Sequence, residues 1–346
     1  MPTDPLVQKG AMFGLIGDLF RDFAHIINFG LAASPDADPQ HQSFSERRDL
    51  ELFQTLKHCV PNLVQLIAEG GPLEVDRIAG LLDKGRSSLR GTDIHTIKKA
   101  VASWRPFNPP IHGDNKDIRG FNHPECGALI CPAHLDWEDP AIQAALRNAT
   151  GEHSIAVPNF FKGLWRRTDV VITKRNKWDG FCENELLCAA LRTSLYGQQA
   201  ALLAPGVRIA ARRPRAQTYR IRTITTGCIA YAAVMDTFSV NGFNNKYNYE
   251  KLYQLIVTAI DTGMPKDRRQ ALFAWWNRFV HTFSASVRVM TFQNRSKVFS
   301  AQYAQDDDIA SPGGNNGQPT IFELMMASDS EDDAEEGVVS AGVVGL

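Results

Sequence analysis

Apolar side chains recur every three or four residues through most of this chain, which is the spacing of helices that bury one face. The clearest examples run from Leu50 to Ile67 and from Asp267 to Phe283, and the segment from Ile224 to Phe238 is predicted to be a buried helix. Between residues 106 and 136 the pattern breaks down, and Pro, Gly, Asn and His dominate. The sequence therefore predicts a mainly α fold, in which a single helical domain contains an irregular Pro/Gly/His-rich middle segment.

Several residues predict where individual helices begin and end. Ser43 and Glu46 have the spacing of a capping box, so a helix should begin there. Pro61 should kink this helix or begin a second one. We expect the next helix to stop near Gly85, and Thr92 to cap a further helix.

The chain divides into three predicted parts. Residues 1–42 hold an amphipathic helix, Met12–Phe29, and a linker; residues 43–300 form the helical domain; residues 301–346 form a disordered acidic tail. The polar face of the first helix carries charges of both signs. This favours packing on protein, either on the chain's own body or on a partner, and makes self-association through Met12–Phe29 one candidate function.

Charge is distributed unevenly along the chain. The formal net charge is −1, but no Lys or Arg follows Lys297, and ten of the 38 acidic residues lie between Asp306 and Leu346. The rest of the chain therefore carries a net charge of +9. A basic body with an acidic tail indicates an anionic partner, or a tail that competes for the basic face. The simpler alternative is a solvated surface with a solubilising tail.

Six arginines without an acidic residue among them are the candidate binding site for nucleic acid or another acidic partner: Arg208, Arg212, Arg213, Arg215, Arg220 and Arg222. Guanidinium groups pair bidentately with phosphate, and Tyr219 offers a ring for stacking. No common nucleic-acid-binding motif supports this interpretation, and a flexible solvated loop is the alternative. The leading prediction is a non-catalytic binding protein.

A second cluster could bind a metal. Its members are His123, Cys126, Cys131 and His134, and two His and two Cys within so short a stretch can surround a tetrahedral Zn²⁺. The spacing matches no common zinc motif, so the alternative is buried thiols and hydrogen-bonded histidines. We expect no cofactor, with zinc as the exception to test.

A metal-dependent enzyme centred on His112–His134 is the hypothesis ranked last. His112-Gly113-Asp114 has the H-x-D form of Fe(II) oxygenases, and His281 and Arg288 could complete such a site. However, that triad belongs on a β-sandwich, whereas this chain is predicted to be helical.

Other features bear on modification and location. Ser328 and Ser330 precede an acidic run and resemble sites of acid-directed kinases. Six irregularly spaced cysteines indicate a reducing compartment rather than a disulfide framework. With no secretory signal and no transmembrane segment expected, the sequence predicts an intracellular protein, nuclear or cytoplasmic.

Several segments resemble a large family of mushroom-type fungal proteins that is known as a domain of unknown function. They are Lys116–Pro132, Leu135–Pro140, Trp178–Gly180, Ile229–Tyr231 and Trp275–Arg278. The resemblance extends from about residue 49 to 283 and departs from the family in the arginine-rich stretch. It implies a single domain, a fungal origin and an intracellular setting, and it implies no catalytic residue.

Overall fold

The computed structural model describes residues 4–33, 42–71, 73–112, 115, 118–148, 160–203, 213–241, 248–281 and 321–327. These ranges form helices and no β-strand, apart from two isolated bridges that join Pro132 to Phe161 and Trp165 to Phe181. The predicted mainly α class with an irregular middle is therefore confirmed. None of the described helices has both the length and the apolarity that a membrane crossing requires.

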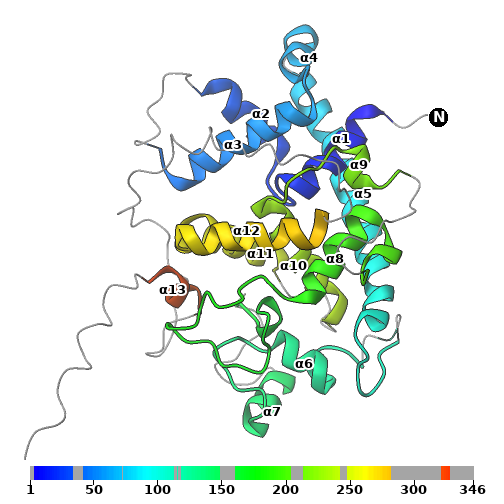
Figure 1. Ribbon diagram of the computed structural model, residues 1–346. Coiled ribbons are helices and arrows are strands. Elements are labelled where there is room, and N and C mark those ends of the chain that lie inside the picture. Colours follow the sequence, from blue (N-terminus) through cyan, green and yellow to red (C-terminus); the bar gives the residue numbers. More distant parts are fainter. Residues whose placement is uncertain are drawn as a thin grey trace, which may run out of the picture.

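The α-helices are shown in Figure 1. In chain order they are α1 Pro5–Ile16, α2 Phe23–Ala32, α3 Phe44–Cys59, α4 Leu63–Gly70, α5 Leu73–Trp104, α6 Pro124–Ile130, α7 Pro140–Asn148, α8 Glu185–Tyr196, α9 Arg215–Thr218, α10 Thr226–Val240, α11 Tyr249–Thr258, α12 Lys266–His281 and α13 Ile321–Met326. Short turns are η2 Gly120–Asn122, η3 Lys162–Leu164, η4 Gln198–Ala200 and the π-helical η5 Ala259–Gly263.

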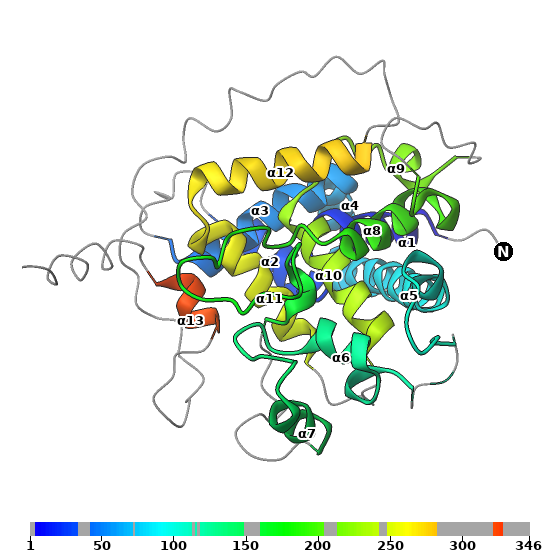
Figure 2. The same ribbon diagram turned by 60° about the horizontal axis from the view of Figure 1, so that its bottom comes forward.

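Helix α10 is the centre of the fold. Fourteen of its 15 residues are buried, because α1, α5, α8 and α11 all pack around it (Figure 2). Its N-cap is Thr225, whose hydroxyl accepts a hydrogen bond from the backbone N–H of Cys228 at 3.2 Å. A helix buried on every side must be apolar all round, which explains why this segment shows little amphipathic periodicity.

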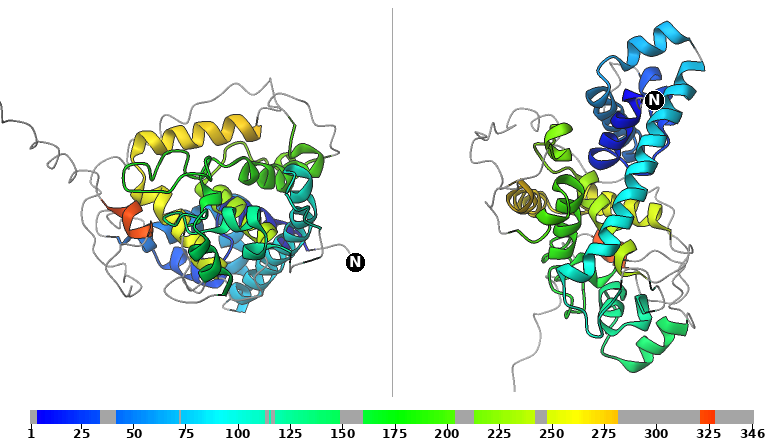
Figure 3. Two further views of the ribbon diagram at one scale, coloured as in Figure 1. Left: turned by 90° about the horizontal axis from the view of Figure 1, so that it is seen from below. Right: turned by 90° about the vertical axis from the view of Figure 1, so that its right-hand side faces the viewer.

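Helix α5 connects the parts of the core. Its 32 residues extend about 48 Å, and in the right-hand view of Figure 3 it runs from the upper end of the molecule down into its middle. Leu82 belongs to the cluster formed with α1–α4, Ile97 to the main cluster around α10, and Val101 to a third cluster with the irregular middle segment. The N-terminal helices are therefore attached to the rest of the core through α5.

The predicted break between Gly85 and Thr92 is wrong, because α5 is continuous there. Gly85 is instead a point of close contact with α1: a Cβ atom at this position would overlap the carbonyl oxygen of Val7. Gly10 of α1 approaches the Leu82 carbonyl in the same way. These glycines allow the two helix backbones to touch, so a residue that resembles a helix stop in the sequence serves packing instead.

The single helix expected at Met12–Phe29 is also corrected, since α1 ends at Ile16 and α2 begins at Phe23. Between them, Asp18 Oδ1 accepts hydrogen bonds from the backbone N–H groups of Phe20 and Arg21, both at 2.8 Å. A short acidic side chain that binds nearby backbone N–H groups competes with helix continuation. The apolar faces of both helices are buried within the chain itself, in the clusters described above.

The irregular middle segment is held by side chains that bind backbone atoms. Arg119 is buried and donates to the carbonyl oxygens of Ser239, Lys98 and His112. Trp165 Nε1 donates to the Lys177 carbonyl at 2.9 Å. A segment with few backbone-to-backbone bonds satisfies its buried carbonyls in this way, without regular secondary structure.

One part of the predicted disordered tail is helical. Helix α13 buries Ile321 and Met325 in the main cluster, and Phe322 packs on Phe160 with ring centroids 6.3 Å apart. At its C-terminal end, Lys177 Nζ donates to the carbonyl oxygens of Leu324 and Ala327, at 3.0 and 2.7 Å. The other residues of 301–346, including Ser328 and Ser330, lie outside the described residues.

Truncation of the chain before α13 should therefore affect stability differently from truncation after α13. A chain that ends at Gln305 loses two buried side chains and two acceptors of Lys177, so we expect its free energy of unfolding to fall by about 2 kcal/mol or more. A chain that ends at Ala327 keeps these contacts and should unfold at the same denaturant concentration as the full chain. Urea unfolding followed by circular dichroism compares them, and equal midpoints for both would contradict the packing of α13.

Candidate anion-binding surface

The structure divides the described arginines of this segment into three that are exposed and one, Arg215, that pairs with a buried carboxylate. Arg213, Arg220 and Arg222 are exposed, and within the described residues none of them pairs with an acidic side chain. They flank the single turn α9. Arg208 and Arg212 lie outside the described residues.

Arg220 occupies a backbone conformation that costs free energy. Its φ angle is 54°, in the left-handed region that glycine usually fills at the end of a helix. The backbone N–H of Ile221 donates to Ala216 O at 2.9 Å and that of Arg220 to Gln217 O at 3.2 Å, which together form a Schellman motif. An arginine here costs about 1 kcal/mol relative to a residue without a Cβ atom. Backbone strain of this kind is often found at functional positions.

Arg215 has a structural role instead. Its Nη1 donates to Asp93 Oδ1 at 2.6 Å and to the Ser194 carbonyl at 3.1 Å, while Tyr231 Oη donates to Asp93 Oδ2 at 2.6 Å. The Asp93 side chain is 4% exposed, so this carboxylate depends on its partners. Burial, reinforced by Asp93, raises the pKa of Tyr231 well above its ordinary value, so its phenol stays protonated. Arg215 therefore belongs to a buried ion pair, and the predicted site loses one of its six members.

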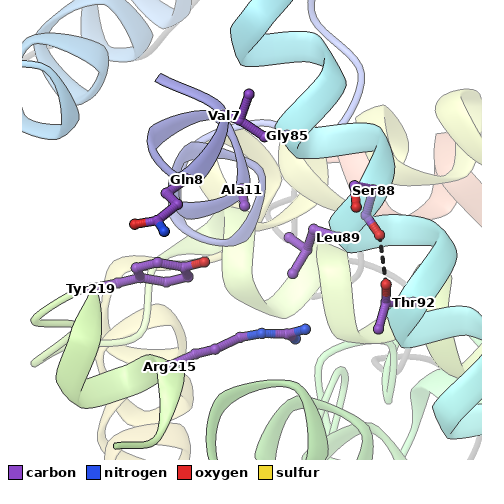
Figure 4. A pocket seen from close by; sticks show the side chains of 9 residues that line it. All are labelled: Val7, Gln8, Ala11, Gly85, Ser88, Leu89, Thr92, Arg215 and Tyr219. Carbon is purple, nitrogen blue, oxygen red and sulfur yellow. Dashed lines mark hydrogen bonds between the residues drawn. The ribbon is translucent and has the colours of Figure 1, made fainter. Parts of the chain in front are cut away.

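An open cleft of about 180 Å³ is lined by Tyr219 and Arg215 together with residues of α1 and α5. Figure 4 shows the Tyr219 ring and the Arg215 side chain extending from the α9 region toward α1 and α5, with Gln8 facing them. On the α5 wall, Thr92 Oγ1 donates to the Ser88 carbonyl at 2.9 Å, so this hydroxyl is already engaged. Tyr219 gives the cleft an aromatic face, and its one charged lining residue, Arg215, is paired with Asp93. Among the lining residues no nucleophile is paired with a base.

The four candidate zinc ligands have other contacts. His123 caps α6, because its Nδ1 accepts from the backbone N–H groups of Glu125 and Cys126 at 3.1 and 3.2 Å, and its Nε2 is 2.6 Å from Pro109 O. Cys126 and Cys131 are buried, and this burial raises the pKa of each thiol to about 12. Within the described ranges, which include His134, no group of three His, Cys, Asp or Glu side chains is placed to hold a metal.

The H-x-D hypothesis falls largely outside the described part of the chain. Asp114 and Arg288 are not described, nor is the side chain of His281. The carbonyl oxygen of His112 accepts a hydrogen bond from Arg119 at 3.3 Å. Nothing in the described contacts brings this set together.

In the segments that resemble the fungal family, side chains mainly form hydrogen bonds that stabilise loops. Trp276 Nε1 donates to the Cys182 carbonyl at 2.9 Å, and Asn277 Oδ1 accepts from the backbone N–H of Ile224 at 3.0 Å. With His123, which lies 2.6 Å from Pro109 O, they fix irregular segments to the helical core. Tyr231 instead joins α10 to Asp93 of α5. The residues of these motifs therefore have mainly structural roles.

Sequence reasoning overlooked two buried aspartates. Asp93 lies midway between Leu89 and Ile97 on the buried stripe of α5, and Asp236 lies within the apolar helix α10. An acidic residue at a core-facing helical position was the available signal, because such a group requires a partner or a shifted pKa.

Together, these observations describe a helical protein with three exposed arginines around α9 and an open cleft lined by Tyr219 and Arg215. A family model described as a family of unknown function, DUF6698, matches residues 84–281, which is more than half of the chain. The chain therefore belongs to the DUF6698 family. The match includes all five resembling segments, and it also covers the arginine-rich stretch. No curated protein and no solved structure matches the chain.

Proposed function

We propose that this chain is a non-catalytic binding protein that engages nucleic acid through Arg213, Arg220 and Arg222, with Tyr219 as a stacking surface. The observation that carries the proposal is the set of three exposed guanidinium groups that lack acidic partners in the described residues. Arg215 serves as the contrast, since its charge is neutralised by Asp93. Such a partner requires an intracellular setting, nuclear or cytoplasmic.

Unpaired arginines and a partly exposed tyrosine fit a phosphate backbone with accessible bases. A guanidinium fork presents two parallel N–H groups to a phosphate, and release of counterions then makes the affinity depend on salt. Base stacking on tyrosine contributes about 1–3 kcal/mol. Burial raises the pKa of Tyr219, with Arg215 opposing this shift, so the ring is uncharged when it meets a base.

The alternative of assembly through Met12–Phe29 has less support. Phe13, Leu15, Phe23, Ile26 and Ile27 are buried in the chain's own core. An interface that used them would first have to expose them.

The test is fluorescence anisotropy with a labelled single-stranded oligonucleotide, DNA and RNA in turn, at two salt concentrations. We expect the variant Arg213→Ala/Arg220→Ala/Arg222→Ala to bind at least tenfold more weakly and with a reduced salt dependence, because up to three phosphate contacts are lost. Arg215 is left unchanged, because its loss would disturb the core. The control Arg175→Ala/Lys251→Ala/Lys266→Ala removes the same charge from other elements.

A single substitution separates binding from stability. Arg220→Gly relieves the strained φ angle and should stabilise the protein by about 0.5–1 kcal/mol, yet it should weaken oligonucleotide binding. Equal affinity of the parent protein and both triple variants would refute the proposal. Binding by an acidic protein but by neither oligonucleotide would replace nucleic acid with a protein partner.

A further inference from the structure

The position of α13 fixes the point from which the acidic segment 328–336 continues. Lys177 is buried, and its Nζ binds the carbonyl oxygens of Leu324 and Ala327, so the last described residue of this segment is attached to the loop 166–180. The side chain of Met326 contacts the π-helical turn, where its Sδ lies 4.0 Å from Thr262 Oγ1. Chain continuing beyond Ala327 therefore starts beside Lys177 and Trp178.

A cavity of about 320 Å³ opens at the same place. Trp178 and Met264 form part of its wall. The charged residues of the wall are three arginines, Arg166, Arg167 and Arg268, and two carboxylates, Asp179 and Glu183. Trp178 also lies near Gly263, the glycine that Met326 contacts, so the end of α13 and the cavity share a wall. The indole Nε1 of Trp178 is buried and has no hydrogen-bond acceptor within the described residues.

The arginines of this cavity retain capacity for another anion. Each has one acidic neighbour: Arg166 pairs with Glu183, Arg167 with Asp169 at 2.8 Å and Arg268 with Asp179 at 3.1 Å. The three arginine side chains are 57%, 71% and 60% exposed, so these pairs contribute little stability and can exchange partners. Each guanidinium offers five N–H donors, more than one carboxylate can use.

The sequence on each side of this contact is complementary in charge. The loop 166–180 holds five basic residues against two acidic ones, and residues 329–336 hold six acidic residues and no basic one. The nine residues from Ser328 to Glu336 can reach about 30 Å from Ala327 when extended, so the whole acidic run lies within reach of the cavity.

We propose that the acidic segment 328–336 docks in the cavity lined by Arg166, Arg167, Arg268 and Trp178, held in place by α13. Its carboxylates pair with the guanidinium groups. Phosphorylation of Ser328 and Ser330, which adjoin the anchor, would add about −1.5 to −2 charges each and strengthen the contact. This inference is independent of the proposed nucleic-acid binding.

The anchor also favours this cavity over the arginines near α9. Helices α13 and α9 lie at opposite ends of the molecule in Figures 1 and 2. A tail attached at Ala327 meets the nearer basic surface first. We therefore place the basic face for which the tail competes at this cavity and not at the arginines near α9.

Pulsed electron paramagnetic resonance on the full chain tests the docking. Spin labels are placed at Gln270→Cys on α12, next to the cavity, and at Ala334→Cys in the acidic run. All six native cysteines are buried, so labelling is selective. We expect one narrow, short distance at low salt that broadens at high salt.

Two sets of substitutions identify the contact. The narrow distance should be lost in Arg166→Gln/Arg167→Gln/Arg268→Gln, and also in Asp329→Asn/Glu331→Gln/Asp332→Asn/Asp333→Asn, which leaves the body unchanged. It should persist in Arg213→Gln/Arg220→Gln/Arg222→Gln. A broad distribution in the parent protein, or a narrow one that neither of the first two sets alters, overturns the proposal. So does a loss that occurs in the third set alone.

Discussion

Replacing Asp236 with asparagine is expected to stabilise the protein at pH 8 by up to about 4 kcal/mol. Asp236 is 1% exposed, and its Oδ1 has no hydrogen-bond partner in the described part of the chain. The nearby Ser239 hydroxyl donates to the backbone carbonyl of Asp236 at 2.7 Å. A buried carboxylate with an oxygen that has no donor is costly when it is ionised.

The direction of the pH dependence follows from the pKa of this group. Burial raises the pKa of Asp236 from 3.8 to about 7, against a smaller opposing effect of Ser239. Between these two values the folded protein holds a proton that the unfolded chain has released. Stability from this source is therefore complete below about pH 4, falls as the pH rises, and is lost above about pH 7. Asparagine stays neutral, so the Asp236→Asn variant should not lose this stability as the pH rises.

Urea unfolding of both proteins between pH 5 and pH 8 checks this expectation. Asp49→Asn is a suitable comparison, because Asp49 is also buried but is paired with Arg21 and lies 2.9 Å from His25 Nε2. Loss of that charge should destabilise the protein. Asparagine should thus have opposite effects at the two sites. A parent protein as stable at pH 8 as at pH 5, with an unchanged Asp236→Asn variant, would show that Asp236 finds a partner.

The sequence predicted helices well where one face is apolar and a cap is present. The capping box at Ser43 and Glu46 forms as expected, and a new helix begins after Pro61. Prediction failed where tertiary contacts determine whether a segment is helical. Gly85 resembles a stop signal, but its meaning depends on α1, which is more than 60 residues away in the chain. Likewise, α13 has only six residues and buries Ile321 and Met325 in the main cluster, so packing against the rest of the fold stabilises it.

The candidate surface could be predicted in part. The cluster of arginines is visible in the sequence, but its division into an internal ion pair and exposed groups is not. Arg215 and Asp93 are 122 residues apart, and their pairing depends on how α9 meets α5. The backbone angle of Arg220 is similarly hidden, since the sequence shows arginine where the geometry favours glycine.

Gly85→Ala should be the most damaging of the small substitutions in α5. Alanine normally stabilises a helix relative to glycine by about 0.5–1 kcal/mol. At Gly85, however, the added Cβ would overlap the Val7 carbonyl and also lie near the backbone N of Ala11, so α1 must move away. We expect a loss of about 3 kcal/mol, at the upper end of the range for overpacked cores.

The same helix supplies matched controls for this substitution. Gly80 and Gly91 are exposed in α5, and a Cβ at either position meets no atom within 4 Å. Gly80→Ala and Gly91→Ala should therefore raise the melting temperature, while Gly85→Ala lowers it. If all three raise it, the α1–α5 contact is looser than the structure has it. The opposite signs would instead show that the N-terminal helices are held to the family domain by direct backbone contact along α5, because only such contact makes a single methyl group so costly.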